Sequence, residues 1–107
     1  MIRVSLRNKI EDEIALFMDY LTVEMGLARN TRESYGRDLR LFAVWVKKRI
    51  KEISRDDILT YMSVLKAQNY AVTSSARKLA ALKAFFRFMT AEGTIEVDPC
   101  EVVESET

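Results

Sequence analysis

The stretch Arg29–Lys51, RNTRESYGRDLRLFAVWVKKRIK, carries the strongest structural signal in this chain of 107 residues. Its apolar residues recur every three or four positions, which places their side chains on one face of an α-helix. They are Tyr35, Leu39, Phe42, Val46 and Ile50, with Trp45 broadening the stripe. The other side collects cations, since the stretch holds eight Lys or Arg residues against two acids. It therefore predicts an amphipathic helix with one core face and one basic face.

Two helix starts can be predicted from capping residues. In the quoted stretch, Asn30 is expected to cap the helix and Glu33 to complete a capping box. Further on, Ser54 and Asp57 have the same spacing and predict the start of a helix that runs to about residue 68. Asn69 is expected to end that helix.

Two further helices are expected on either side of these. Residues 9–25 should form a helix capped by Asn8 and ended by Gly26 in the left-handed conformation. Its expected buried stripe is Ile10, Ile14, Phe17, Met18, Leu21 and Met25. Residues 73–92 should form the last helix, because Leu79, Leu82, Phe86 and Met89 recur at helical spacing.

Composition limits the class of protein. A hydrophobic content of 49% with 31% charged residues is typical of a globular domain, and 107 residues suffice for one such domain. No apolar run is long enough to span a bilayer. The single cysteine, Cys100, allows no internal disulfide, so a reducing, cytoplasmic location is expected. The sequence predicts an all-α domain over residues 1–97 with four main helices. Residues 98–107, which begin Asp98-Pro99, are expected to start a linker.

Charge is unevenly distributed along the chain, although the total is only +1. Residues 29–51 carry a net +6, residues 73–90 a net +4 and residues 91–107 a net −6. A run of cations is often only a solvated helix face. Two basic helices, however, favour a polyanion, because Lys and Arg bind phosphates and the major groove of DNA admits a helix.

The sequence contains little evidence of a catalytic site. The chain has no His, so it lacks the commonest general base and metal ligand. The pair Asp56-Asp57 is better explained as helix-start charge than as an acid/base pair. Cys100 has no basic sequence neighbour that would lower its pKa. We therefore expect no catalytic residue, no metal site and no cofactor.

Two stretches resemble the signatures of the core-binding domain of tyrosine recombinases, the phage-integrase family, and in particular its Xer-like members. The first comprises Gly26-Leu27, Asn30-Thr31, Ser34-Tyr35, Arg37-Asp38-Leu39, Phe42 and Trp45. The second comprises Ser75-Ala76-Arg77-Lys78-Leu79, Ala81-Leu82-Lys83, Phe85-Phe86, Phe88, Glu92-Gly93 and Asp98-Pro99. The resemblance covers about residues 11–104.

This resemblance implies a SAM-like domain of two crossed helical hairpins, whose second and fourth helices lie against DNA. It implies double-stranded DNA at a recombination site and other recombinase protomers as partners, with no membrane and no small-molecule substrate. Catalysis in this family belongs to a C-terminal domain, which is expected to be absent from this chain.

Carried over by position, the residues expected to bind DNA lie on those two helices. On the second helix they are Asn30, Thr31, Arg32, Tyr35 and Arg37. On the fourth they are Ser74, Ser75, Arg77, Lys78 and Lys83. Hydroxyls and unpaired N–H groups at the start of the fourth helix suit a phosphate. Gly36 and Ala80 depart from the family pattern, and Gly36 is expected to cost the helix roughly 1 kcal/mol.

Two other interpretations stay open. The chain could be a helical protein-interaction module that uses residues 9–25 and the acidic tail. It could also be a stand-alone DNA-binding regulator without recombinase activity. Binding to a protein but to no duplex would favour the first. The open reading frame beyond residue 107 would decide the second.

Overall fold

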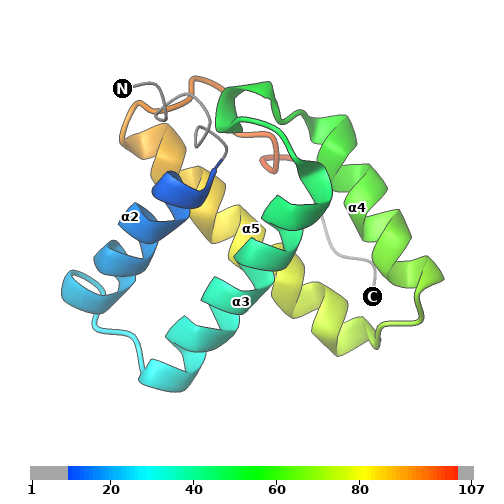
Figure 1. The fold of residues 1–107 in the computed structure, drawn as a ribbon, viewed down its shortest axis with the longest axis horizontal. Helices are drawn as coiled ribbons and strands as arrows, with labels where there is room; N and C mark the ends of the chain where they lie inside the picture. The colour runs from blue at the N-terminus through cyan, green and yellow to red at the C-terminus, as the bar shows by residue number, and fades with distance from the viewer. Residues whose placement is uncertain (1–9, 104–107) are drawn as a thin grey trace. The chain divides into compact units, whose positions relative to one another are not determined.

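The computed structural model describes residues 10–103, and all of its regular structure in that range is helical (Figure 1). The four α-helices are α2 (Glu11–Val23), α3 (Arg29–Val46), α4 (Arg55–Ala67) and α5 (Val72–Ala91), with a 3₁₀ turn η1 (Ile50–Glu52) after α3. No helix within residues 10–103 has the length and apolar character needed to cross a bilayer. The predicted all-α fold with four main helices is confirmed.

The described residues form two compact units that divide between Glu52 and Ile53. In the first unit α2 packs against α3, and in the second α4 packs against α5 (Figure 1). Each unit is therefore a helical hairpin, as expected. The crossing of the two hairpins stays a prediction.

The apolar stripes predicted for the first unit are largely buried. On α2, Ile14, Phe17 and Leu21 are at most 3% exposed, and they lie three or four residues apart as a core-facing stripe requires. Met25 was expected to extend this stripe, but its side chain is 53% exposed. The reason is that α2 ends at Val23, so residue 25 no longer follows the helical period.

The turn from α2 to α3 combines one correct prediction with one wrong one. Gly26 adopts φ +60° as predicted, and Leu27 N–H donates to the Leu21 carbonyl at 3.2 Å. Asn30 is not a cap, because α3 already begins at Arg29 after an extended Ala28 that makes no side-chain cap bond. The Asn8 cap predicted for α2 lies outside the described residues.

The end of α3 also differs from the prediction. The helix stops at Val46 because Lys47 adopts the left-handed conformation, with φ 51°. Ile50 is nevertheless buried, at 6% exposure, from its position in η1. The apolar spacing thus identified the buried residue correctly but did not reveal the break in the helix before it.

In the second unit the predicted capping box of α4 is confirmed. Asp57 N–H donates to Ser54 Oγ at 3.2 Å, and Ser54 N–H donates to Asp57 Oδ2 at 2.9 Å. Ile53 and Ile58, on either side of this box, are both buried. Asn69 follows α4 with φ 63°, which agrees with its predicted role in ending the helix.

Gly36 has a packing role that sequence reasoning missed. A Cβ atom at this buried position would lie 3.2 Å from Met18 Cε on α2 and 3.2 Å from Arg40 Nη1. The missing side chain therefore leaves room for the close packing of α2 against α3. This packing offsets the unfavourable helix propensity of glycine.

Candidate nucleic-acid interface

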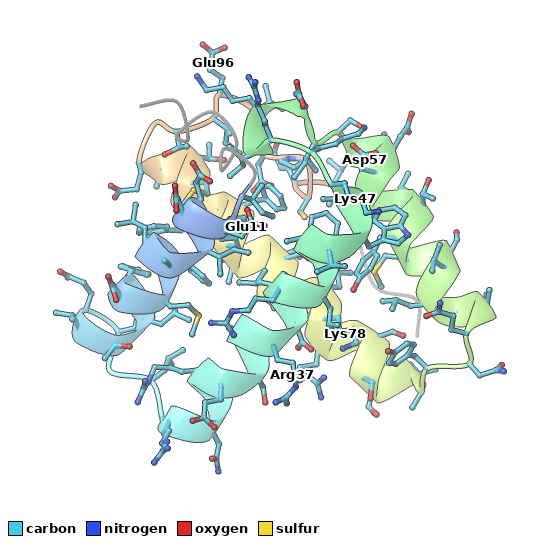
Figure 2. The ribbon with its side chains drawn as sticks, in the orientation of Figure 1. Glu11, Arg37, Lys47, Asp57, Lys78 and Glu96 are labelled. Atoms are coloured by element: carbon cyan, nitrogen blue, oxygen red, sulfur yellow. The ribbon has the colours of Figure 1, made fainter. Side chains whose placement is uncertain are left out.

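Three of the residues expected to bind DNA are exposed on α3. Asn30, Thr31 and Arg37 are exposed, and Arg37 is labelled on α3 in Figure 2. Tyr35 is half-buried. Arg40, one turn beyond Arg37, is exposed on the same side of the helix. The basic face predicted for this helix is therefore present at its centre.

Arg32 has a different environment from the one expected. Its Nε donates to the Leu27 carbonyl at 3.2 Å, and its Nη1 donates to Thr22 Oγ1 at 3.4 Å. The side chain is half-buried, so the expectation that it is exposed is wrong. These bonds join the first turn of α3 to the chain that precedes it, which gives Arg32 a structural role.

The N-terminal part of α3 also carries an anion, one turn after Arg29. Arg29 Nε lies 3.0 Å from Glu33 Oε2, and the two side chains are 80% and 57% exposed. Exposed pairs of this kind contribute little to stability. Their effect here is electrostatic, because Glu33 offsets one cation at this end of the face.

The exposed face of α5 consists of cations separated by alanines. Arg77, Ala80 and Arg87 are exposed, while Lys83 and Ala84 are half-buried on the same side of the helix. Small side chains between cations allow a flat or grooved partner to approach the helix axis closely. The cations of this face belong to the segment of residues 73–90, whose net charge is +4.

The N-terminus of α5 offers donors to an anion. The helix begins at Val72 after an extended Ala71 with no side-chain cap bond. Ser75 N–H donates to the Ala71 carbonyl at 3.0 Å, which is the first hydrogen bond of the helical i to i−4 series. The backbone N–H groups of the helical residues before Ser75 have no acceptor within the helix. Ser74 and Ser75 are half-buried in this first turn.

Lys78 does not share the exposed face of α5. Its side chain is only 4% exposed, and Nζ lies 5.2 Å from the centre of the Tyr70 ring. A cation over an aromatic face is attracted by the ring quadrupole. Lys78, labelled in Figure 2, thus differs from the DNA-facing position expected for it. Lys78 follows Arg77 by one residue, which corresponds to a rotation of roughly 100° about the helix axis. This rotation turns the Lys78 side chain toward the core.

Sequence reasoning left two exposed cations out of the expected set. Arg40 on α3 and Arg87 on α5 lie on the same faces as Arg37 and Arg77. Helical periodicity places Arg40 with Arg37 and Arg87 with Arg77, whereas the family resemblance did not include them. Periodicity was therefore the better guide to exposure at these positions.

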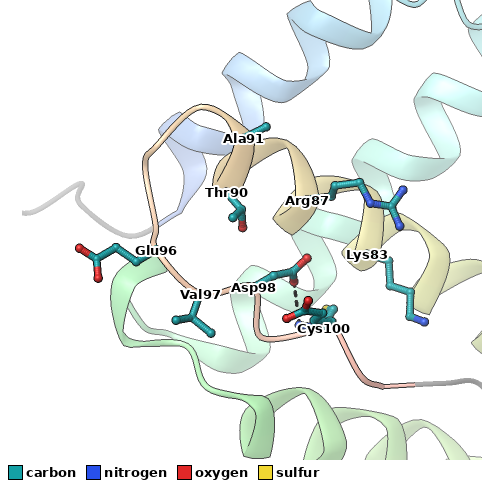
Figure 3. A pocket seen from close by; sticks show the side chains of 9 residues that line it. Lys83, Arg87, Thr90, Ala91, Glu96, Val97, Asp98 and Cys100 are labelled. Carbon is teal, nitrogen blue, oxygen red and sulfur yellow. Dashed lines mark hydrogen bonds between the residues drawn. The ribbon is translucent and has the colours of Figure 1, made fainter.

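A shallow pocket of about 550 Å³ lies beside the C-terminal half of α5 (Figure 3). Lys83 and Arg87 line it from the helix, and Asp98 and Glu101 line it from the turn that follows. Asp98 Oδ1 accepts a hydrogen bond from Cys100 N–H at 2.8 Å. Acidic groups of the tail thus lie beside two cations of the basic face.

The residues expected to begin a linker include several that are packed. Cys100 and Val103 are 1% and 3% exposed, and Pro99 is also buried. Val103 N–H donates to the Cys100 carbonyl at 3.1 Å. Residues 98–103 therefore form a folded turn, and the domain boundary after residue 97 stays a prediction.

The Cys100 thiol lies in an environment that favours its neutral form. Burial and, to a lesser degree, Asp98 raise its pKa to about 12, against an opposing effect from Lys83. The thiol is thus protonated at neutral pH and is a poor nucleophile. Among residues 10–103, no three His, Cys, Asp or Glu side chains are grouped so as to hold a metal ion.

Comparison with known proteins identifies the family. The family model for the phage integrase N-terminal SAM-like domain matches residues 14–93. Tyrosine recombinase XerC of Roseiflexus sp. (strain RS-1) is 37% identical over 100 residues, covering 90% of this chain and 32% of the relative. Tyrosine recombinase XerD of Pseudomonas aeruginosa is 41% identical over 86 residues, covering 78% and 29%. Tyrosine recombinase XerD of Lacticaseibacillus casei is 38% identical over 94 residues, covering 86% and 32%.

These matches cover most of this chain but only part of each relative. The chain spans about a third of the length of these curated relatives. No solved structure matches it in the corresponding search. The family match covers most of α2 and all of α3, α4 and α5, which are the elements that carry both basic faces. The chain therefore belongs to the phage integrase family, as its N-terminal SAM-like domain.

Proposed function

We propose that this domain binds double-stranded DNA through the exposed faces of α3 and α5. The observation that carries the proposal is the pair of solvent-exposed cation rows, Arg37 with Arg40 on α3 and Arg77 with Arg87 on α5. Cations on such faces neutralise phosphates and release counterions, which supplies affinity for any sequence. The names of the relatives support the same function, since they are tyrosine recombinases.

The proposed target is half of a recombination site, bound mainly through its phosphates. Phosphate contacts fix the position and orientation of a protein on the duplex, and contacts to base edges specify sequence. Asn30, Arg37 and the hydroxyls of Ser74 and Ser75 are the proposed positioning groups. Lys78 is assigned a structural role instead, because it is buried beside Tyr70.

Strand cleavage and rejoining are assigned to a second domain, which the relatives' greater length would accommodate. In this proposal residues 1–97 bind DNA and the chain beyond residue 97 leads to that domain, with residues 98–103 packed first as a turn. The catalytic activity, its recombination substrate and its partners thus belong to the complete recombinase.

The test is a fluorescence-anisotropy titration with a labelled duplex of about 30 base pairs. We expect Arg37→Ala and Arg87→Ala each to weaken binding several-fold, because each removes an exposed cation from a proposed contact face. Lys66→Ala is the matched control, since Lys66 is an exposed cation on α4 outside both faces. An equal effect of all three variants would indicate a general charge effect and would count against the proposed faces.

A second surface fits the other partner expected for this family, a neighbouring recombinase protomer. On α2, Leu16 is 51% exposed and Val23 is 77% exposed, and these two apolar residues lie seven positions apart on one side of the helix. We propose that they contact a second protomer on DNA. Leu16→Ala with Val23→Ala should reduce cooperative binding to a duplex with two half-sites and leave binding to a single half-site unchanged.

A further inference from the structure

Two large apolar side chains lie exposed within the basic face of α3. Leu41 is 45% exposed and Val44 is 69% exposed. Single exposed apolar residues are normal on protein surfaces. These two, however, are three residues apart on one side of the helix, and Arg37 and Arg40 lie on the same side.

The surroundings of the apolar pair are cationic at both ends. Arg37 lies one turn before Leu41, and the exposed Lys47 directly follows the last residue of α3, three positions after Val44. At 1.5 Å per residue, the helical span from Arg37 to Val46 is about 14 Å. That length corresponds to roughly four base-pair steps of DNA at 3.4 Å each. The pattern along the helix is therefore cation, apolar pair, cation.

The major groove of DNA has a matching distribution of chemistry. Its two rims are lined by phosphates, and its floor presents one apolar group, the C5-methyl of thymine. A protein surface that binds only phosphates would not need a leucine and a valine between its cations. A surface with this pattern is complementary to a groove that has thymine on its floor.

We propose that Leu41 and Val44 contact thymine methyl groups in the major groove while Arg37 and Arg40 bind the flanking phosphates. This proposal rests on the proposed DNA-binding function and adds a source of base preference to it. The recognised chemistry is a 5-methylpyrimidine, so 5-methylcytosine satisfies the same contact.

The test compares duplexes that differ only in the methyl group. One pair is alternating A·T and alternating A·U of equal length, titrated at one salt concentration by fluorescence anisotropy. We expect the wild-type domain to bind the thymine duplex about four- to fifteen-fold more tightly, as burial of one or two methyl groups predicts. Alternating G·C with 5-methylcytosine should likewise bind more tightly than unmethylated G·C.

Variants connect this preference to the two side chains. Leu41→Ala with Val44→Ala should bind the thymine and uracil duplexes equally, with wild-type circular dichroism because both residues are exposed. Leu59→Ala, which truncates a 41%-exposed leucine on α4, should keep the preference. Persistence of the preference in the double variant overturns the proposal, as does equal binding of both duplexes by the wild type.

The outcomes also separate this proposal from the one it rests on. Salt-dependent binding without any methyl preference contradicts only the role of Leu41 and Val44. Absence of binding to every duplex contradicts the DNA-binding function and this inference together.

Discussion

Arg32 illustrates how a cation in a basic stretch can serve the fold. Its guanidinium bonds the Leu27 carbonyl and Thr22 Oγ1, while Arg37 on the same helix is exposed. A hydrogen bond from a charged donor to a neutral acceptor contributes about 1.5–3 kcal/mol to stability where water is excluded. Its contribution is smaller in a half-buried site. The two arginines should therefore respond differently to substitution.

We expect Arg32→Ala to lower the free energy of unfolding by about 1 kcal/mol, because it removes both bonds. Arg37→Ala should leave it within about 0.5 kcal/mol, as is usual for exposed sites. Chemical denaturation followed by circular dichroism measures both values. Equal stabilities of the two variants would show that the bonds of Arg32 contribute nothing to the fold.

Cys100 provides a second test at the scale of the residue. Its pKa, raised to about 12 by burial, leaves almost no thiolate at pH 8. We expect the native domain to react with an aromatic disulfide reagent far more slowly than the urea-unfolded chain at the same pH. Rapid labelling of the native domain would show that the turn over residues 98–103 does not protect the thiol.

Among the helices, α4 has the best-defined start. Its capping box satisfies two backbone N–H groups, through the bonds between Ser54 and Asp57. Ser54→Ala should lower the free energy of unfolding by about 1 kcal/mol, the usual value for loss of a cap. Ser63→Ala, at an exposed position within the same helix, is the control and should be close to neutral. A neutral Ser54→Ala would mean that water replaces the cap.

The ends of the other helices show what local sequence cannot specify. Asn30 and Glu33 have the spacing of a capping box, yet Glu33 pairs with Arg29 and the helix begins before Asn30. Several favourable local arrangements compete there, and they differ by only a few tenths of a kcal/mol. The left-handed Lys47 that ends α3 carries no glycine or proline signal in the sequence. Such a break is set by packing rather than by local preference.

The candidate site was predictable to the extent that helical period determines exposure. Arg37, Arg77 and Asn30 are exposed as expected, and helical periodicity puts the exposed Arg40 and Arg87 on the same faces as Arg37 and Arg77. Lys78 was included in the expected set only through the family resemblance, whereas its angular position lies on the buried side of α5. The cation–π contact with Tyr70 could not be foreseen, since it depends on the path of the chain before α5.

For the whole molecule, the decisive sequence property was the segregation of charge rather than its total. A net charge of +1 gives no reason to expect a polyanionic partner. The division into +6, +4 and −6 segments does, and the structure leaves Arg37 and Arg40 exposed on α3 and Arg77 and Arg87 exposed on α5. The acidic turn beside Lys83 and Arg87 had been expected to belong to a linker. The turn is packed through the buried side chains of Pro99, Cys100 and Val103. The sequence could not predict this packing, because so short an apolar segment shows no helical or strand periodicity.

The central claim is that the exposed face of α3 and the exposed face of α5 each bind DNA phosphates. Its most direct test is the slope of log K against log salt concentration, for the wild type, Arg37→Ala, Arg87→Ala and the double variant. The account predicts a steep wild-type slope that becomes less negative by about 0.9 in each single variant and by about 1.8 in the double variant. A wild-type slope near zero, or a slope that neither substitution changes, would contradict it.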